Sequence, residues 1–442
     1  MKKIPLSNST IKIGLILILI LLFLIPVSLI KNLISDRNHY QREALQSITE
    51  PLGGETQLQG LVIAVPYKTH KETYSNNGSR IVQTETKYVL FAPDSYMMDI
   101  SVNPYYLTRG IFKVPVFNGQ IQLKAEFVDF DFSYFNIPDA DIMKKDAVLI
   151  LGLSNTKNLT KQPALMINKK ELHVSPIKYD SISPFKTSVY YPVILDDQNG
   201  KCLLSGIIDF QGGENIKIYP IAQENFFDMK SDWKSPSFSG GWLPKERELS
   251  DNGFSALWDI AGLSTVYPKS WLAGTQFSAE AVNVSFMIPV DSYKKTERSV
   301  KYALLFLMIP FIALLISEIF SKTKIHPIQY CLIGFADVIF YLLLLSSSEH
   351  ISFDLAYLIC SVSVCLATLL YASAIFRNKK WGALLSGVQL VSYIFLYGTL
   401  QAEDYALLIG SIGLFIVVAL LMFITRKIDW YGLTETLDGT IL

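Results

Sequence analysis

Asp337 is the residue whose type and position most suggest chemistry, because it is a lone carboxylate near the middle of an apolar run from Ile328 to Ser347. An ionised carboxylate at the centre of a membrane helix costs at least about 2.5 to 3.5 kcal/mol, so Asp337 must face protein or water. Tyr341 follows four residues later on the same helix face, and we expect its hydroxyl to donate a hydrogen bond to Asp337. The pair is either a proton or ion relay, or a protonated or hydrogen-bonded packing site.

Charged residues also gather beside the apolar runs. Four cations precede one run and three carboxylates lie in the short loops nearby: Lys294, Lys295, Arg298 and Lys301, with Glu349, Glu403 and Asp404. One hypothesis is that these charges seat the large middle domain on the helices, since a low dielectric strengthens ion pairing. The alternative is that the cations bind lipid phosphates while the acids are solvated. His350, beside Glu349, predicts either a pH-sensitive site or a loop-packing residue.

The composition shows which elements must position these residues. Of 442 residues, 50% are hydrophobic and 18% are charged, whereas roughly 25% of a typical soluble chain is charged. The mean hydropathy is +0.31, which leaves too little polar surface for one soluble globule, so a lipid bilayer is the expected partner. The 39 basic and 39 acidic residues give 39 − 39 = 0, and without a basic field we expect no nucleic-acid binding.

Six apolar runs are each near the length of a membrane-spanning helix. The first, Ile13 to Ile30, continues into polar sequence without a cleavage site and is interpreted as an uncleaved anchor. The other five follow residue 300: Tyr302–Phe320, Ile328–Ser347, Phe353–Phe376, Gly382–Leu400 and Tyr405–Thr425. Small residues four apart predict that the last two runs approach closely: Gly382 and Ser386, Ala383 and Gly387, Ala406 and Gly410.

Lys and Arg alternate between the short loops and predict the orientation of the chain. They occur at the N-terminus, in two loops and after the last run: Lys2, Lys3, Lys12, Lys322, Lys324, Arg377, Lys379, Lys380, Arg426 and Lys427. Because cytoplasmic loops retain positive charge, both termini are expected in the cytoplasm and the large domain outside. The predicted boundaries are an anchor over 1–34, an outer domain over 35–300, five helices over 301–427 and a cytoplasmic tail over 428–442.

The middle of the chain has the signals of a mainly-β domain. Asn118-Gly119 lies between two alternating segments of Lys113–Phe127 and predicts a two-residue hairpin turn. Arg37–Glu50 is instead a polar helix that continues the anchor, ended by Pro51–Gly54. Further strands are expected in runs rich in β-branched and aromatic residues: Leu61–Tyr67, Lys87–Phe91, Met97–Val102, Ala147–Leu153, Leu165–Ile167, Gly206–Phe210, Ile216–Tyr219 and Val282–Ile288.

Patterns typical of catalysis or cofactor binding are missing from the sequence. Three of the four cysteines fall in apolar stretches and Cys202 is alone in a polar region, so we expect neither a disulfide scaffold nor a metal site. There is no phosphate-binding Gly-rich Lys-Ser/Thr loop, which excludes ATP hydrolysis as an energy source. We therefore expect no catalytic residues, no metal and no cofactor.

Ordered sequence motifs across the second half are similar to those of a known family. They begin with Trp233–Pro244 (WKSPSFSGGWLP) and continue through Gly253–Trp258, Pro289–Tyr293, Glu297–Tyr302, Ile325–Tyr330, Phe340–Ser346, Ser348–His350, Glu403–Ser411 and Asp429–Tyr431. This series resembles the CreD family of inner-membrane proteins over essentially the whole chain. The resemblance implies a bacterial inner-membrane protein with a large periplasmic domain, linked to envelope integrity and the CreB/CreC two-component response. It implies no established enzymatic activity.

Three functional hypotheses remain open from the sequence. In the first, a non-enzymatic envelope protein uses its β-rich outer domain to bind or sense a periplasmic or membrane protein partner. In the second, the five-helix region transports or conducts a solute, with Asp337 and the outer acidic loops along the route. The third, an anchored periplasmic hydrolase, lacks a nucleophile, base or metal constellation. A polar cavity that reaches Asp337 would favour transport over partner binding.

Overall fold

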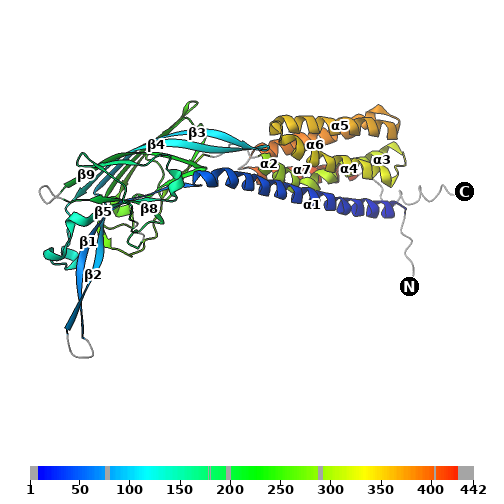
Figure 1. Ribbon diagram of the computed structural model, residues 1–442. Helices are drawn as coiled ribbons and strands as arrows, with labels where there is room; N and C mark the ends of the chain where they lie inside the picture. The colour runs from blue at the N-terminus through cyan, green and yellow to red at the C-terminus, as the bar shows by residue number, and fades with distance from the viewer. Residues whose placement is uncertain are drawn as a thin grey trace. The chain divides into compact units, whose positions relative to one another are not determined.

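The computed structural model describes residues 8–74, 80–177, 179, 181–195, 201–286, 292–402 and 405–426 (Figure 1). The chain forms two compact units. The helical unit combines Met1–Gln41 with Val290–Leu442, and the β unit is Arg42–Pro289. The predicted fold class is confirmed: one N-terminal apolar helix, a large mainly-β middle region and five C-terminal apolar helices.

Six helices of the described chain are long and apolar enough to cross a membrane. The helices are α1 (Asn8–Thr49), α2 (Ser292–Lys301), α3 (Ala303–Ser321), α4 (Pro327–Ser348), α5 (Phe353–Phe376), α6 (Lys379–Gln401) and α7 (Ala406–Thr425), of which only the short α2 is not such a span. The predicted polar helix from Arg37 continues the anchor within α1 as far as Thr49. A 3₁₀ turn, Glu50–Leu52, follows and ends at Gly53 and Gly54, whose positive φ angles of 94° and 72° favour glycine.

The start of α4 follows the helix-capping rules. Pro327 is its first residue, where its missing N–H group removes no helical hydrogen bond. The Nδ1 atom of His326 accepts a hydrogen bond from the Ile328 amide at 3.3 Å. The Gln329 side chain accepts one from the His326 amide at 3.0 Å, which completes a reciprocal cap. His326 therefore has a structural role at this helix end.

Aromatic packing holds α1 against the other helices. The Phe23 ring lies 6.0 Å from Phe311 of α3 and 5.0 Å from Phe335 of α4, between ring centroids. A Cβ atom on Gly334 would come within 2.6 Å of the Phe23 ring. Gly334 therefore allows the Phe23 ring to approach the α4 backbone.

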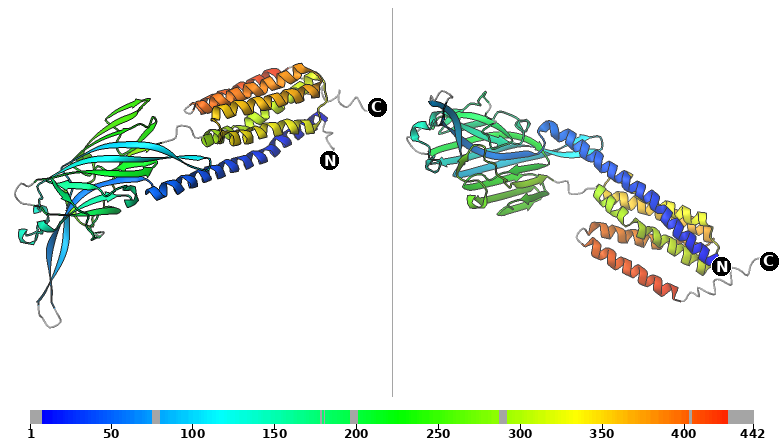
Figure 2. Two further views of the ribbon diagram at one scale, coloured as in Figure 1. Left: turned by 45° about the horizontal axis from the view of Figure 1, so that its top comes forward. Right: turned by 90° about the horizontal axis from the view of Figure 1, so that it is seen from below.

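α6 and α7 approach each other at Gly413, where a Cβ atom would come within 2.2 Å of the Phe395 ring, but the small residues predicted to allow this approach lie elsewhere. A Cβ atom on Gly382 would meet Ser373 and Leu369 of α5, so this glycine brings α6 close to α5 instead. Ala383 and Gly387 line an apolar groove of about 640 Å³ among α3, α6 and α7. Figure 2 shows α7 on the side of the bundle away from α1. The small residues of α6 therefore pack against α5 at Gly382 and line the groove beside α7 at Ala383 and Gly387.

The β unit contains two eight-stranded sheets. In the first, the order is β12-β16-β10-β1-β2-β15, with β5 paired to β1 and β8 to β5; in the second it is β13-β14-β11-β3-β4-β9-β6-β7. The strands are β1 (Thr56–Tyr74), β2 (Arg80–Phe91), β3 (Ser95–Arg109), β4 (Phe112–Val128), β5 (Ala147–Leu153), β6 (Ala164–Ile167), β7 (Lys170–Leu172), β8 (Thr187–Val193), β9 (Lys201–Gly213), β10 (Asn215–Ile218), β11 (Glu224–Ser231), β12 (Pro236–Gly240), β13 (Glu246–Ser250), β14 (Gly253–Ala261), β15 (Ser270–Leu272) and β16 (Val282–Phe286).

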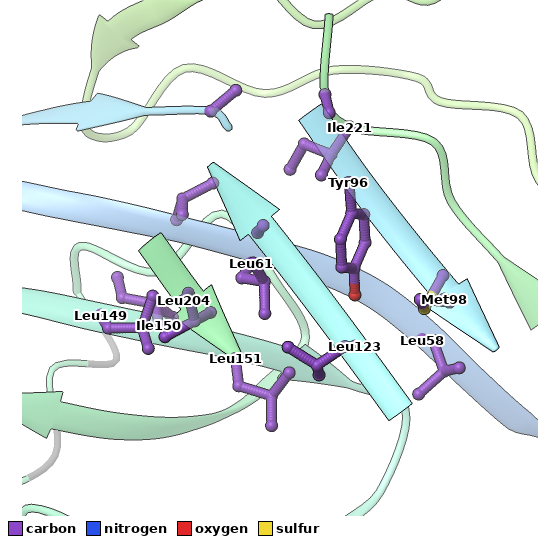
Figure 3. Packing of buried hydrophobic residues seen from close by; sticks show 14 of the residues in the cluster. Leu58, Leu61, Tyr96, Met98, Leu123, Leu149, Ile150, Leu151, Leu204 and Ile221 are labelled. Atoms are coloured by element: carbon purple, nitrogen blue, oxygen red, sulfur yellow. The ribbon is translucent and has the colours of Figure 1, made fainter. Parts of the chain in front are cut away.

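Apolar side chains from both sheets form a single buried core. Figure 3 shows members of this core from both sheets, among them Leu61 of β1 and Leu151 of β5 from the first and Leu123 of β4 and Met98 of β3 from the second. In β3 and β9 buried and exposed residues alternate, as expected for strands with one face in the core. Every residue of β5 is buried, so this strand is covered on both faces.

The predicted hairpin at Asn118-Gly119 is wrong, because both residues lie inside the continuous strand β4. They pair with β3 on one side and β9 on the other. A Cβ atom on Gly119 would come within 2.4 Å of the Phe210 ring, so this glycine makes room for an aromatic side chain. The turn lies earlier, at Gly110 and Ile111, where Gly110 has a φ of 60°.

Two hairpins extend past the strands that flank them (Figure 1). In the β1–β2 arm, Lys68–Tyr74 pairs with Arg80–Thr86, beyond the pairing of these strands with β5 and β15. The second hairpin is the β3–β4 tip, Tyr105–Pro115, in which the two strands pair only with each other. The pairing of β3 with β11 ends at Val102, and the pairing of β4 with β9 begins at Val116. Each is a two-stranded ribbon that contributes little to the core.

Candidate functional site

The buried polar group at the centre of the helical unit is built around Asp337 of α4. Its side chain is buried, with 4% of the residue exposed. Burial of a carboxylate is expensive unless it is neutralised or hydrogen-bonded. Among the described residues, α6 supplies both hydrogen-bond donors: Gln389 donates its side-chain amide to Oδ1, and the Tyr393 hydroxyl donates to the same oxygen at 3.2 Å.

The predicted hydrogen bond from Tyr341 to Asp337 is not formed. The Tyr341 hydroxyl is buried and has no hydrogen-bond partner in the described part of the chain. Gln389 and Tyr393 are four residues apart on α6, so they project from one face and both reach the carboxylate. An amide inside the apolar run Gly382–Leu400 was the sequence signal that could have identified this partner helix.

Aromatic side chains enclose the α6 side of this site. The Phe340 and Tyr393 rings stack with centroids 4.4 Å apart. Tyr357 of α5 lies 5.4 Å from Phe340 and donates its hydroxyl to the Tyr393 backbone oxygen at 2.7 Å. Three helices therefore fix the Tyr393 ring, and with it the position of the hydroxyl that binds Asp337.

Three buried oxygen atoms of this site have no partner among the residues that the structure describes. They are Asp337 Oδ2, Tyr341 Oη and Gln389 Oε1. A carboxyl group with one oxygen bound by two donors and the other bare can carry a proton on the bare oxygen. An internal water bound to two or more of these oxygens would be the other way to satisfy them. We call Asp337, Tyr341, Gln389 and Tyr393 the Asp337 cluster.

Two grooves lie between helices in the described part of the bundle. The groove of about 640 Å³ among α3, α6 and α7 and a second of about 460 Å³ beside α2 and α7 are both mainly apolar. Asp337 lines neither of them. The polar route that would favour transport is therefore not formed by either groove.

Glu349, which follows α4, contacts side chains of α1 and α2 at one polar end of the bundle. The Tyr293 hydroxyl of α2 donates to Glu349 Oε1 at 3.0 Å, and Arg37 Nε of α1 lies 3.4 Å from the same oxygen. Neighbouring His350 is exposed. Glu403 and Asp404 lie outside the described residues. The sequence analysis did not identify Arg37 or Tyr293 as partners of Glu349, and the predicted role of Glu349 stays a prediction.

The four predicted junction cations lie on α2. Lys295 donates to the Gln401 side chain of α6 at 2.9 Å, and its ammonium lies 5.4 Å from the centre of the Phe353 ring. Lys301 pairs with Glu297 one turn earlier at 3.2 Å. Lys294 and Arg298 belong to the same helix. These contacts lie inside the helical unit, and the seating of the outer domain by these cations stays a prediction.

The opposite ends of α1 and α4 carry a second polar contact that the sequence did not reveal. Lys12 of α1 pairs with Glu318 of α3 and donates to the Ile325 backbone oxygen at 3.0 Å. Glu318 also accepts from the Tyr330 hydroxyl at 2.8 Å and from the Ile325 amide at 3.1 Å. Its carboxylate thus joins α1, α3 and the start of α4.

Comparison with known proteins decides the family. The CreD family, described as "Inner membrane protein CreD", matches residues 8–431. The Inner membrane protein CreD of Escherichia coli (strain K12) is 29% identical over 417 residues, which cover 93% of this chain and 92% of that protein. The chain belongs to the CreD family. CreD is a family of inner membrane proteins and is not a known family of enzymes.

Several CreD motif residues have structural roles in the β unit. Trp233 donates its indole N–H to the Ser235 oxygen at 3.2 Å, and Trp258 donates to the Trp242 oxygen at 3.3 Å. Gly253 has a φ of 130°, and a Cβ atom there would lie 2.0 Å from the Ser231 oxygen. The motifs that carry the resemblance to CreD therefore include residues that fix the backbone.

Side chains that could hold a metal are dispersed in this CreD chain. Within the described ranges, there is no group of three or more His, Cys, Asp or Glu residues that could hold a metal ion. His70 pairs with Asp141 at 3.0 Å and with the Thr84 hydroxyl at 3.3 Å, at the base of the β1–β2 arm. These contacts fix His70 at the base of the arm.

Proposed function

We propose that this chain is a non-enzymatic inner-membrane protein that supports envelope integrity or the response to envelope stress. In this proposal both termini are cytoplasmic and the β unit is periplasmic, where it binds or senses a protein partner. The alternation of Lys and Arg among the short loops supports the orientation. Membership of the CreD family supports the location in the inner membrane.

The β1–β2 arm is the observation that favours binding by the β unit. Its described side chains include exposed polar groups of both charges, Lys68, Lys71, Glu72 and Glu85. Asp141 and Thr84 hold His70 at the base of the arm, so the ribbon is pre-ordered. A pre-ordered polar ribbon loses little conformational entropy when a partner binds, which favours recognition. Little of the domain core depends on it.

An arm replacement tests this function. Joining Thr69 directly to Glu85 through Asn-Gly removes the arm from His70 to Thr84 and keeps the strand pairing below it, because Thr69 faces Glu85 in the register. We expect this variant to reach the membrane at normal levels but to fail to restore growth under envelope stress in cells that lack the native copy. Exposed Leu263→Ser, on the same unit, serves as the control and should restore growth. Full restoration by the arm variant would contradict the proposal.

The second candidate function is proton-coupled transport through the helical unit. It is favoured by the bare oxygens of the Asp337 cluster, which could bind a proton or water. The same complementation assay separates the two functions. Asp337→Asn removes the titratable group and preserves the shape of the side chain. Loss of growth in Asp337→Asn together with retention in the arm variant would favour transport.

A further inference from the structure

The β3–β4 tip carries large apolar side chains outside the core. Tyr105, Tyr106, Leu107 and Ile111 are all exposed, with 47% of Tyr106 and 42% of Ile111 accessible to solvent. These residues are contiguous around the turn at Gly110 rather than scattered over the unit. Contiguous exposed apolar side chains at a loop end mark an interaction site more often than isolated ones.

The charge of the tip is uniformly positive. Arg109 and Lys113 are exposed on either side of the turn. The segment Tyr105–Pro115 contains neither Asp nor Glu. Tyrosine has an apolar ring and a polar hydroxyl and is enriched where membrane proteins meet the lipid headgroups. Arg and Lys at that level are attracted to anionic lipid phosphates.

The β1–β2 arm provides an internal contrast, because it is the same kind of ribbon with a different surface. Its described exposed side chains include Lys71, Glu72 and Glu85, of both charges, and a single large apolar residue, Val82. Exposure on an extended hairpin therefore does not by itself require apolar residues. The aromatic and basic composition of the β3–β4 tip calls for a separate explanation.

Packing at the base of the tip holds its direction within the β unit. The Tyr106 ring lies 5.5 Å from the ring of Trp233, between centroids. Trp233 is itself fixed by the hydrogen bond from its indole N–H to Ser235. The tip is therefore a supported ribbon, which can present Leu107 and Ile111 without first becoming ordered.

We propose that the β3–β4 tip inserts its apolar side chains into the headgroup region of the bilayer that carries the protein. Arg109 and Lys113 then bind lipid phosphates. In the sequence, the β unit lies between α1 and α3, two helices able to span a membrane. Attachment at both ends keeps the β unit at a high effective concentration near lipid, so even a weak individual contact forms. The proposal does not depend on the partner-binding function.

A spin-label depth measurement tests the contact in the full chain. The four native cysteines are replaced, and a label is attached to Leu107→Cys or to the control Leu263→Cys, which is fully exposed on the same unit. Both proteins are placed in nanodiscs of phosphatidylethanolamine with phosphatidylglycerol. We expect oxygen to relax the label at 107 more strongly than a water-soluble nickel complex does. The order should be reversed for the label at 263.

A charge reversal examines the role of lipid phosphates in the same nanodiscs. Arg109→Glu with Lys113→Glu should bring a label at Ile111→Cys out into water, while the protease-resistant fragment of the β unit stays unchanged. The proposal is overturned if the label at 107 reports the same aqueous environment as that at 263. It is equally overturned if the label is shielded from both agents, because that result identifies a protein surface as the occupant.

Discussion

Two buried asparagines of the β unit form hydrogen bonds through both their oxygen and their nitrogen atoms, whereas, among the described residues, buried Asp337 of the helical unit forms them through one oxygen only. In the β unit, Asn225 accepts from the Ala222 amide at 3.0 Å and donates to the Ala222 and Ile260 oxygens at 2.8 and 3.2 Å. Asn158 likewise uses both its oxygen and its nitrogen, with partners that include Ser154 and Gln211. In the helical unit, Asp337 has two donors on one oxygen and none from the described residues on the other.

This difference indicates a structural role for the asparagines and makes Asp337 a candidate for a functional role. A fully bonded asparagine that ties loop and strand backbone together needs no further explanation. Among the described residues of the β unit, Gln223, Trp271 and Asn283 each have one buried atom without a partner. The described helical unit has four such atoms, one on Thr368 and three in the Asp337 cluster. Buried oxygen atoms without hydrogen-bond partners in an apolar bundle can bind a proton or a water molecule, or can form a second arrangement of side-chain hydrogen bonds.

The largest expected effect comes from breaking a fully bonded group. Asn225→Ala should lower the free energy of unfolding of the β unit by about 3 kcal/mol, because the Ala222 amide and the Ile260 oxygen lose buried partners. A urea transition followed by tryptophan fluorescence of the purified full-length protein would measure this loss. Asn118→Ala, at an exposed asparagine of β4, is the matched control and should change stability by less than about 0.5 kcal/mol. Equal losses of stability in the two variants would show that the buried hydrogen bonds of Asn225 do not stabilise the β unit.

The Asp337 cluster should respond according to which hydrogen bonds survive. Asp337→Leu removes the acceptor of Gln389 and Tyr393 and should destabilise the helical unit by about 2 kcal/mol. Asp337→Asn keeps an acceptor oxygen and adds a donor for the bare oxygens, so we expect a change within about 1 kcal/mol. The loss of helical circular dichroism in a dodecyl sulfate titration measures both. If Asp337→Asn destabilised the helical unit as much as Asp337→Leu does, a negative charge on Asp337 would be needed for stability.

The lengths of the apolar runs and the composition of the strands were enough to predict the six membrane-spanning helices and the mainly-β middle unit. The six spans and most strands follow from local sequence, since each is a property of a few neighbouring residues. The partners of Asp337 do not, because Gln389 and Tyr393 reach it through packing of two helices far apart in the chain. The same limit explains the Asn118-Gly119 error. Only the position of Phe210 reveals that Gly119 is required inside a strand.

That error leads to a test of glycine in the two-sheet core. Gly119→Ala should destabilise the β unit by about 1.5 kcal/mol, because the added methyl group would meet the Phe210 ring and the Ser101 oxygen. Gly110→Ala meets no atom within 4 Å and bears only the strain of a φ of 60°, which costs about 1 kcal/mol or less. The urea transition should therefore rank Gly119→Ala as the more damaging change. A turn at Asn118-Gly119 would reverse that order.

The smallest expected effects lie at the two ends of the membrane-spanning part of α1. Lys12 contacts both Glu318 and the Ile325 oxygen, and Glu318 is held by two further donors. Lys12→Ala should therefore cost the helical unit about 1 kcal/mol in the dodecyl sulfate titration, as expected for a partly buried charged hydrogen bond. Arg37 has 40% of its side chain exposed and lies 3.4 Å from Glu349, so Arg37→Ala should cost about 0.5 kcal/mol or less. A larger loss at Arg37 than at Lys12 would show that Glu349, although bonded to Tyr293, depends on α1 for its charge balance.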